Sequence, residues 1–283
     1  MPELPEVETI VRGLRSAVLG LRIVRVELRR PGIALAPAGR SFEERLTGER
    51  IAGVRRRGKY AVLELGSGCA LVISLRMTGR LVVQRPGEPD YPHTHALFAL
   101  EDGRRLSFAD SRRFGRLRLV EPGEAWDAWL GIEPLSGDFT PQRFAAMLAG
   151  RTTPIKTVLL DQRRLAGIGN IYACEALWEA RIRPNTPAGR LSAPAIRRLR
   201  EAIVDVLRRA TELRGSSVDD YVDAEGLRGG FQNVLSVYGR HGRPCPRCGR
   251  PIVRTLLAQR GTWWCRSCQR ERPGSRVRRR GKK

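Results

Sequence analysis

The sequence predicts a multidomain α+β chain: an N-terminal antiparallel β-sandwich with flanking helices, then a helical region, then a small C-terminal β-hairpin module that carries cysteines. Three observations lead to this fold class. Short alternating apolar stretches separated by Gly, Pro and Asp-Gly turns fill residues 21–120, apolar residues at helical spacing dominate residues 154–214, and two Cys-x-x-Cys pairs lie near the end. A chain of 283 residues is long enough for more than one domain.

The first predicted element is an amphipathic helix over residues 5–19. Apolar residues, among them Ile10 and Leu14, recur there at helical spacing. Pro5 suits the first helical turn, and Glu6 suits the positive end of the helix dipole.

About seven or eight strands are expected next. Alternating stretches rich in Val, Leu and Ile predict them: RIVRVELR, RIAGVRRR, YAVLELG, CALVISLRMTGRLVVQ, HALFALEDG, RRLSFAD and GRLRLVE. The SLRM stretch breaks the alternation and is expected to leave the sheet. Residues 121–150 have the character of a connector.

Helices are expected again at PIKTVLLDQ, NIYACEALWEARI and SAPAIRRLREAIVDVLRRATEL, which keep 3.6-residue spacing. The Gly-rich residues 215–240 predict a loop around a short helix, and the final stretch RPGSRVRRRGKK predicts a basic, disordered tail.

Charge indicates the partner. Lys and Arg together number 52 against 29 acidic residues, a net charge of +23. A chain this basic favours a polyanion, most often nucleic acid, although an Arg-rich composition can also be inherited from a GC-rich genome. If phosphates are the target, binding weakens steeply with salt. The sequence has no apolar run long enough for a membrane span and no signal-peptide pattern, so we expect no membrane partner and a cytoplasmic location.

The cysteine pattern C-x2-C-x16-C-x2-C indicates a metal site. In a reducing compartment, four thiolates in two knuckles favour one structural zinc ion on a β-hairpin finger over a pair of redox motifs. The predicted ligands are Cys245, Cys248, Cys265 and Cys268. Cys69 and Cys174 lie in apolar stretches and are expected to be core residues.

The stretch GIGN predicts a tight turn between two helices. Gly167 and Gly169 permit the turn, and Asn170 lies where a helix N-cap belongs. The start of such a helix can bind a phosphate, but an ordinary helical hairpin explains the same residues. A dinucleotide-binding fold is excluded because no strand precedes the glycines.

The N-terminus MPELPE admits two interpretations. One is a capped helix. The other is a reagent: removal of Met1 leaves Pro2 as a free secondary amine, and an α-amino group titrates at about 7.7–8.0, so part of it is neutral near pH 7. Such an amine can form an iminium with an electrophilic sugar carbon, while Glu3 and Glu6 supply proton transfers.

Together, the motifs MPELPEVET, RRRGKY, RMTGRL, SRRFGR, GIGNIY and AQRGT, with the terminal cysteine pattern, resemble the formamidopyrimidine-DNA glycosylases. The resemblance runs in order from residue 2 to about residue 270. It implies a bifunctional base-excision repair enzyme that removes 8-oxoguanine and formamidopyrimidines from duplex DNA. It further implies that the enzyme cuts the backbone at the abasic site by β- and δ-elimination.

Roles carried over by the resemblance are as follows. Pro2 is the Schiff-base nucleophile at C1′, Glu3 protonates the sugar, and Glu6 is a further active-site glutamate. Lys59 serves β-elimination and phosphate contact, and Arg260 serves δ-elimination and phosphate binding.

A flipped base leaves a hole in the duplex that must be filled. The resemblance assigns this role to Met77, Arg112 and Phe114; without the family, Met77 and Phe114 would be interpreted as core residues. It assigns phosphate contacts to a further set: His93, Arg112, Arg151, Lys156, Asn170 and Arg260. Ser74 and Ser111 stand where relatives often carry His and Pro.

The predicted domains are a catalytic β-sandwich domain at 1–135, a helix-two-turn-helix DNA-binding domain at 136–240, a zinc finger at 241–272 and a basic tail at 273–283. Residues 216–232 look like the family's lesion-capping loop. We expect a monomer that binds damaged double-stranded DNA in the nucleoid, with zinc and no redox or nucleotide cofactor. Two alternatives stay open: an endonuclease VIII-type glycosylase for oxidised pyrimidines, or a catalytically silent DNA-binding protein.

Overall fold

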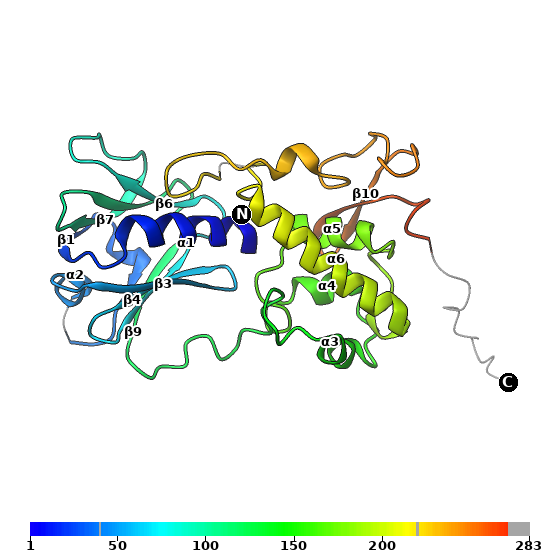
Figure 1. Cartoon of the computed structure of the whole chain (residues 1–283), viewed down its shortest axis with the longest axis horizontal. Coiled ribbons are helices and arrows are strands. Elements are labelled where there is room, and N and C mark those ends of the chain that lie inside the picture. The colour runs from blue at the N-terminus through cyan, green and yellow to red at the C-terminus, as the bar shows by residue number, and fades with distance from the viewer. Residues whose placement is uncertain (40, 219–220, 271–283) are drawn as a thin grey trace. The chain divides into compact units, whose positions relative to one another are not determined.

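A computed structural model describes residues 1–39, 41–218 and 221–270 (Figure 1). The predicted tail at 273–283 lies outside the described residues. The described residues form two compact units, one made of Met1–Gly131 and Arg208–Val234, the other of Ile132–Leu207 and residues 235–270. No helix in the described part of the chain combines the length and apolarity that crossing a bilayer requires.

The first unit contains two sheets. One has the strand order β1-β7-β8-β6 and is antiparallel throughout. The other has the order β2-β9-β5-β4-β3, antiparallel except for the short parallel β2–β9 pair. The strands are β1 (Ile23–Leu28), β2 (Ala34–Leu35), β3 (Ile51–Arg57), β4 (Tyr60–Leu65), β5 (Ala70–Ser74), β6 (Gly79–Gln84), β7 (Thr94–Leu100), β8 (Arg105–Asp110) and β9 (Arg116–Val120).

The helix α1 (Leu4–Val18) supplies the third component of this core. Its apolar stripe is fully buried, and it joins inward-facing side chains of both sheets in one cluster, as the 3.6-residue spacing predicts. The members include Ile10 and Leu14 from α1, Leu63 and Leu71 from one sheet, and Phe98 and Phe108 from the other. The predicted antiparallel sandwich with a flanking helix is confirmed.

The SLRM stretch does leave the sheet, because β5 ends at Ser74 and β6 begins at Gly79. One element was not predicted: the short helix α2 (Phe42–Leu46), which begins with a capping box between Ser41 and Glu44. The short 3₁₀ helices η1 (Pro31–Ile33) and η2 (Ala188–Arg190) lie in connecting segments.

The second unit contains the predicted helices and the cysteine hairpin. The helices are α3 (Pro141–Leu148), α4 (Ile155–Leu160), α5 (Asn170–Glu179) and the first part of α6 (Ala193–Glu212). The hairpin strands are β10 (Val253–Leu257) and β11 (Arg260–Trp264). The connector predicted at 121–150 is wrong in its last part, because α3 forms there with Thr140 as N-cap and Pro141 in its first turn.

The Gly-rich segment returns to the first unit. Its predicted short helix is present as the 3₁₀ helix η3 (Phe231–Val234). Residues 208–234 therefore group with the sandwich and not with the helices before them, a division that the domain boundaries predicted from the sequence do not draw.

Candidate functional site

The chain's start is buried at the positive end of α1. Pro2 and Glu3 are both buried, and Glu3 is the N-cap residue of the helix. Glu6, at the third helical position, is 1% exposed, and its Oε2 accepts a hydrogen bond from the backbone N–H of Glu3 at 2.7 Å. A carboxylate is stable here because a hydrogen bond and the helix dipole both favour negative charge.

The second oxygen of Glu6 faces another segment. Glu6 Oε1 accepts from the backbone N–H of Ser216 at 2.7 Å, and the hydroxyl of Tyr221 donates to the backbone oxygen of Glu6 at 3.3 Å. Burial, and then the charge of Glu6, raise the pKa of Tyr221 well above its ordinary value, so the phenol keeps its proton. One glutamate therefore joins the N-terminus to the predicted capping loop.

Gly215 makes this close approach possible. Its φ is +80°, and a Cβ built on it would lie 2.8 Å from Oε1 of Glu6. Any larger residue would be strained in its backbone and would displace the carboxylate. The buried hydroxyl of Ser216 has no hydrogen-bond partner within the described part of the chain.

The rest of the predicted capping loop is held by its own polar side chains and by the sandwich. Asp223 accepts from the backbone N–H groups of Glu225 and Leu227, both at 3.0 Å, and pairs with Arg214. The carbonyl of Ala224 accepts from the N–H of Val83 at 3.0 Å, so the loop covers part of edge strand β6.

Lys59 lies in the two-residue turn between β3 and β4, and its side chain is half-buried. The preceding arginines are engaged in ion pairs: Arg56 with Glu8 at 3.0 Å, and Arg57 with Asp127 at 2.8 Å. Because Glu8 belongs to α1, the Arg56 pair fixes the turn of Lys59 against the helix that begins beside Pro2.

Met77, Arg112 and Phe114 lie on two adjacent loops at one end of the sheet that contains β6 and β8. Met77 is 40% exposed and Phe114 is 50% exposed, which excludes the core alternative for both. The guanidinium of Arg112 lies 5.0 Å from the centre of the Phe114 ring, a cation–π contact. The structure thus brings the predicted trio together, and its void-filling role stays a prediction.

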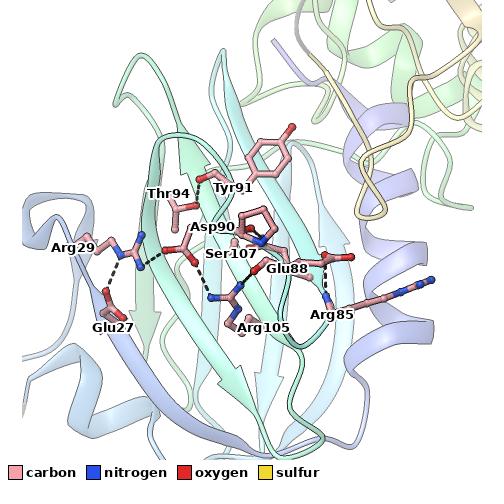
Figure 2. Close-up of polar contacts among 11 residues, drawn as sticks. Glu27, Arg29, Arg85, Glu88, Asp90, Tyr91, Thr94, Arg105 and Ser107 are labelled. Atoms are coloured by element: carbon pink, nitrogen blue, oxygen red, sulfur yellow. Dashed lines mark hydrogen bonds and ion pairs between the residues drawn. The ribbon is translucent and has the colours of Figure 1, made fainter.

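His93 ends the loop between β6 and β7, in a left-handed conformation with φ of +62°. An ion-pair network braces this loop (Figure 2): Asp90 accepts from Arg29 at 2.6 Å and from Arg105 at 2.7 Å. The hydrogen bond from Arg29 is the main reason that the pKa of Asp90 lies below its usual value. The exposed His93 is therefore presented by a braced segment.

In the second unit, two residues predicted to contact phosphates also hold the hairpin, and their phosphate contacts stay predictions. The ammonium of Lys156, which is 1% exposed, donates to Gly261 O at 3.1 Å and to Thr262 Oγ1 at 2.7 Å. The amide of Asn170 donates to the same Gly261 carbonyl at 3.0 Å, and among the described residues its own Oδ1 has no hydrogen-bond partner. These contacts position the backbone next to Arg260, which is exposed at the start of β11.

The N-cap of α5 is Gly169, and Asn170 is the first helical residue, so the predicted N-cap is wrong by one position. Arg151 donates through Nε to Met147 O at 2.7 Å and so satisfies a carbonyl near the end of α3. Phosphate contact by Arg151 stays a prediction.

The four cysteines of the finger converge. Their Sγ atoms all lie within 4.8 Å of one another, with Cys245–Cys268 at 3.9 Å and Cys248–Cys265 at 3.5 Å. Four thiolates at Zn–S bonds of about 2.3 Å in a tetrahedron lie about 3.8 Å apart, whereas a disulfide requires about 2.05 Å. The arrangement therefore fits a tetrahedral ion.

The surroundings of this cluster also suit a metal site. The indole N–H of Trp178 on α5 donates to Cys245 Sγ at 3.4 Å, and the backbone N–H of Cys268 donates to Cys265 Sγ at 3.5 Å. Such donors stabilise negative sulfur. Cys69 and Cys174 are buried core residues, as predicted.

Several residues that organise the loops were not found from the sequence. Asp110 is the last residue of β8 and precedes the loop of Arg112, and an Asp before a polar turn is a known turn signal. Tyr221 is an aromatic residue within a Gly- and Asp-rich loop. Glu175 on α5 accepts from the N–H groups of residues 236–238, at 2.8 to 2.9 Å, and no local pattern indicates that partner.

Three family models match the chain. Residues 1–117 match the formamidopyrimidine-DNA glycosylase N-terminal domain, residues 130–222 match the H2TH domain of the same glycosylase, and residues 242–270 match a zinc finger found in FPG and IleRS. A formamidopyrimidine-DNA glycosylase of Moorella thermoacetica is 50% identical over 258 residues, which are 90% of this chain and 94% of that protein.

Solved structures agree with the sequence matches. The Fpg protein of Thermus thermophilus superposes with a TM-score of 0.85 at 46% identity, covering 96% of this chain and 100% of that chain. A Lactococcus lactis Fpg variant bound to DNA containing Fapy-dG gives 0.88 at 36% identity, covering 95% and 100%. The wild-type Lactococcus lactis protein, bound to DNA containing an oxidised pyrimidine, gives 0.87 at the same identity and coverage.

Glu6→Gln is predicted to release the segment around Ser216. Each oxygen of Glu6 accepts one backbone N–H, and a glutamine amide would direct its NH₂ group against one of them. Leaving a buried donor unpaired costs about 1–3 kcal/mol, so amide exchange in the peptide 213–218 should accelerate about tenfold or more.

Hydrogen–deuterium exchange with mass spectrometry measures this effect. Glu8→Gln is the matched control, because Glu8 lies on the same helix but pairs with arginines. Unchanged exchange at 213–218 in Glu6→Gln would show that the contact does not hold the loop.

Proposed function

Because this chain belongs to the formamidopyrimidine-DNA glycosylase family, we propose that it is a bifunctional DNA glycosylase and abasic-site lyase acting on oxidised purines in duplex DNA. The observation that carries the proposal is the buried start of the chain. Pro2, Glu3 and Glu6 lie at the positive end of α1, and Glu6 contacts the segment that would close over a flipped base.

Pro2 acts first. Once Met1 is removed, the secondary amine of Pro2 attacks C1′ of the damaged nucleotide. The bond between C1′ and the base breaks, and the base leaves. Opening of the sugar ring then gives an iminium between Pro2 and C1′. The neutral amine is required, and the adjacent positive end of the helix favours that form by disfavouring a positive charge.

Proton transfers fall to the neighbouring acids and bases. Glu3, buried at the N-cap, supplies the proton that the sugar ring oxygen takes up on opening. Lys59, which lies in the β3–β4 turn beside α1, assists β-elimination. Arg260, at the tip of the finger, assists δ-elimination and binds a phosphate.

The base must leave the duplex before this chemistry can occur. Met77 and Phe114 wedge into the stack, and Arg112 hydrogen-bonds the widowed base. We propose that four further residues serve phosphate binding, either by contacting a phosphate or by holding the protein backbone that contacts it: His93, Arg151, Lys156 and Asn170. Of these, Lys156 and Asn170 support Arg260 through the Gly261 carbonyl.

One structural zinc ion would be held by Cys245, Cys248, Cys265 and Cys268. Bound there, it would supply folding free energy to a hairpin too small to fold alone. We further propose that the protein acts as a monomer in the cytoplasm, on nucleoid DNA.

A second candidate is removal of oxidised pyrimidines, because a relative of this family has been solved on DNA containing one. Single-turnover incision of 8-oxoguanine:cytosine and thymine-glycol duplexes separates the two. We expect faster incision of 8-oxoguanine; faster incision of thymine glycol would favour the second candidate. A chain that binds both duplexes and cuts neither would be a silent binder.

Glu3→Gln is predicted to slow 8-oxoguanine incision by about 100-fold or more, because general acid catalysis contributes about 10²–10⁴ to a rate. Glu43→Gln, on α2, where no proposed site residue lies, is the control and should keep the wild-type rate. A Glu3→Gln rate within about twofold of the wild type would remove Glu3 from the mechanism.

Metal analysis should find one zinc ion per chain, and Cys248→Ser should lower that content because it removes one of four ligands. Cys69→Ser, a buried cysteine outside the cluster, should leave the zinc content at one. Zinc-free protein with an intact finger, judged by slow amide exchange at 253–264, would contradict the assignment.

A further inference from the structure

Two loops that carry exposed apolar side chains meet at one buried carboxylate. Residues 75–78 present Met77, residues 111–114 present Phe114, and Asp110 lies between the loops and is 1% exposed. We propose that Asp110 is a positioning residue that locks the two loops together, so that Met77 and Phe114 can displace a base from the stack. The inference rests on the proposed function, which itself gives Asp110 no role.

The carboxylate of Asp110 is shared between the loops. Its Oδ1 accepts from the hydroxyl of Thr78 and from the backbone N–H of Arg112 at 3.2 Å. Its Oδ2 accepts from the backbone N–H of Gly115 at 2.7 Å. The Arg112 N–H also lies 3.2 Å from Thr78 Oγ1, so the three groups close a triangle.

The backbone of Asp110 is itself fixed. It ends β8 opposite Gly79, the first residue of β6. Its N–H donates to His93 O at 3.1 Å, and the His95 ring nitrogen Nε2 lies 2.8 Å from its carbonyl. The carboxylate therefore projects from a rigid end of the sheet. The same sheet end anchors His93 through its backbone carbonyl.

Both loops are conformationally strained. Arg76 and Arg113 have φ values of +53° and +62°, in the left-handed region that side chains disfavour. Gly115 is needed for close approach, since a Cβ there would lie 2.5 Å from Phe108 Cζ and 3.2 Å from Asp110 Oδ2. Strained loops of this kind persist only where surrounding contacts hold them in place, and Asp110 supplies hydrogen bonds to both loops.

Rigidity matters because of what the side chains must do. A flexible loop would fold Met77 or Phe114 back onto the protein surface to remove apolar area from water. Wedging a base stack costs free energy, and a wedge that is already ordered avoids an additional entropic cost.

Asp110→Asn tests the proposal without changing side-chain volume. An amide has one oxygen and one NH₂ group, so it cannot accept on both sides and must present a donor to one loop. We expect excision of 8-oxoguanine paired with cytosine to slow about tenfold or more, about 1.4 kcal/mol in activation free energy. Cleavage of a pre-formed abasic site, which has no base to displace, should stay within about twofold of wild type.

Matched variants distinguish this role from general destabilisation. Thr78→Val removes the bridging hydroxyl and should show the same selective defect, whereas Thr78→Ser keeps the hydroxyl and should behave as wild type. Asp102→Asn, whose carboxylate accepts from Arg104 at the opposite end of β8, should change neither rate. The Thr78 pair also decides the matter if Asp110→Asn does not fold.

If Asp110→Asn slows base excision and abasic-site cleavage equally, or slows neither, the inference is overturned and the proposed function still stands. Likewise, equal excision rates in Thr78→Val and Thr78→Ser would overturn it. If the wild-type protein cleaves neither substrate, the proposed function fails first, and the inference fails with it.

Discussion

The candidate site in the first unit depends on the two hydrogen bonds that the carboxylate of Glu6 accepts. This carboxylate is buried, and each of its oxygens accepts one backbone N–H, from Glu3 on one side and from Ser216 on the other. Residues separated by 210 positions in sequence are thereby joined at the start of α1. The helix dipole and the two hydrogen bonds together offset the cost of burying the charge. The start of α1 and the segment around Ser216 are therefore held together by one side chain.

The same device recurs across the molecule. Among the residues that the structure describes, the buried acidic side chains are Glu3, Glu6, Asp110, Glu175 and Asp223. The last four each accept hydrogen bonds from backbone N–H groups of a loop. In a chain with a net charge of +23, the few buried acids therefore act as organisers of loops, while arginines predominate at the surface. Carboxylates suit this task because they accept several strong hydrogen bonds and donate none.

Sequence reasoning succeeded where the determinant is local. Periodicity predicted α1, the sandwich strands and the hairpin, and the cysteine spacing predicted a cluster that the structure assembles. It missed α2 and α3, although a capping box at Ser41 and the pair Thr140–Pro141 signalled both. It could not find the partners of Asp110 and Glu6, or the burial of Lys156 beneath the hairpin, because these contacts join distant segments whose pairing leaves no local pattern.

The most direct test of the account concerns the atom that bonds to the substrate. The protein is mixed with abasic duplex DNA, reduced with borohydride and digested, and the peptide that carries the DNA is sequenced by mass spectrometry. The account predicts a single adduct on the nitrogen of Pro2, at the start of a peptide that lacks Met1. An adduct on a lysine such as Lys59, or efficient strand cleavage by a protein that retains Met1, would contradict it.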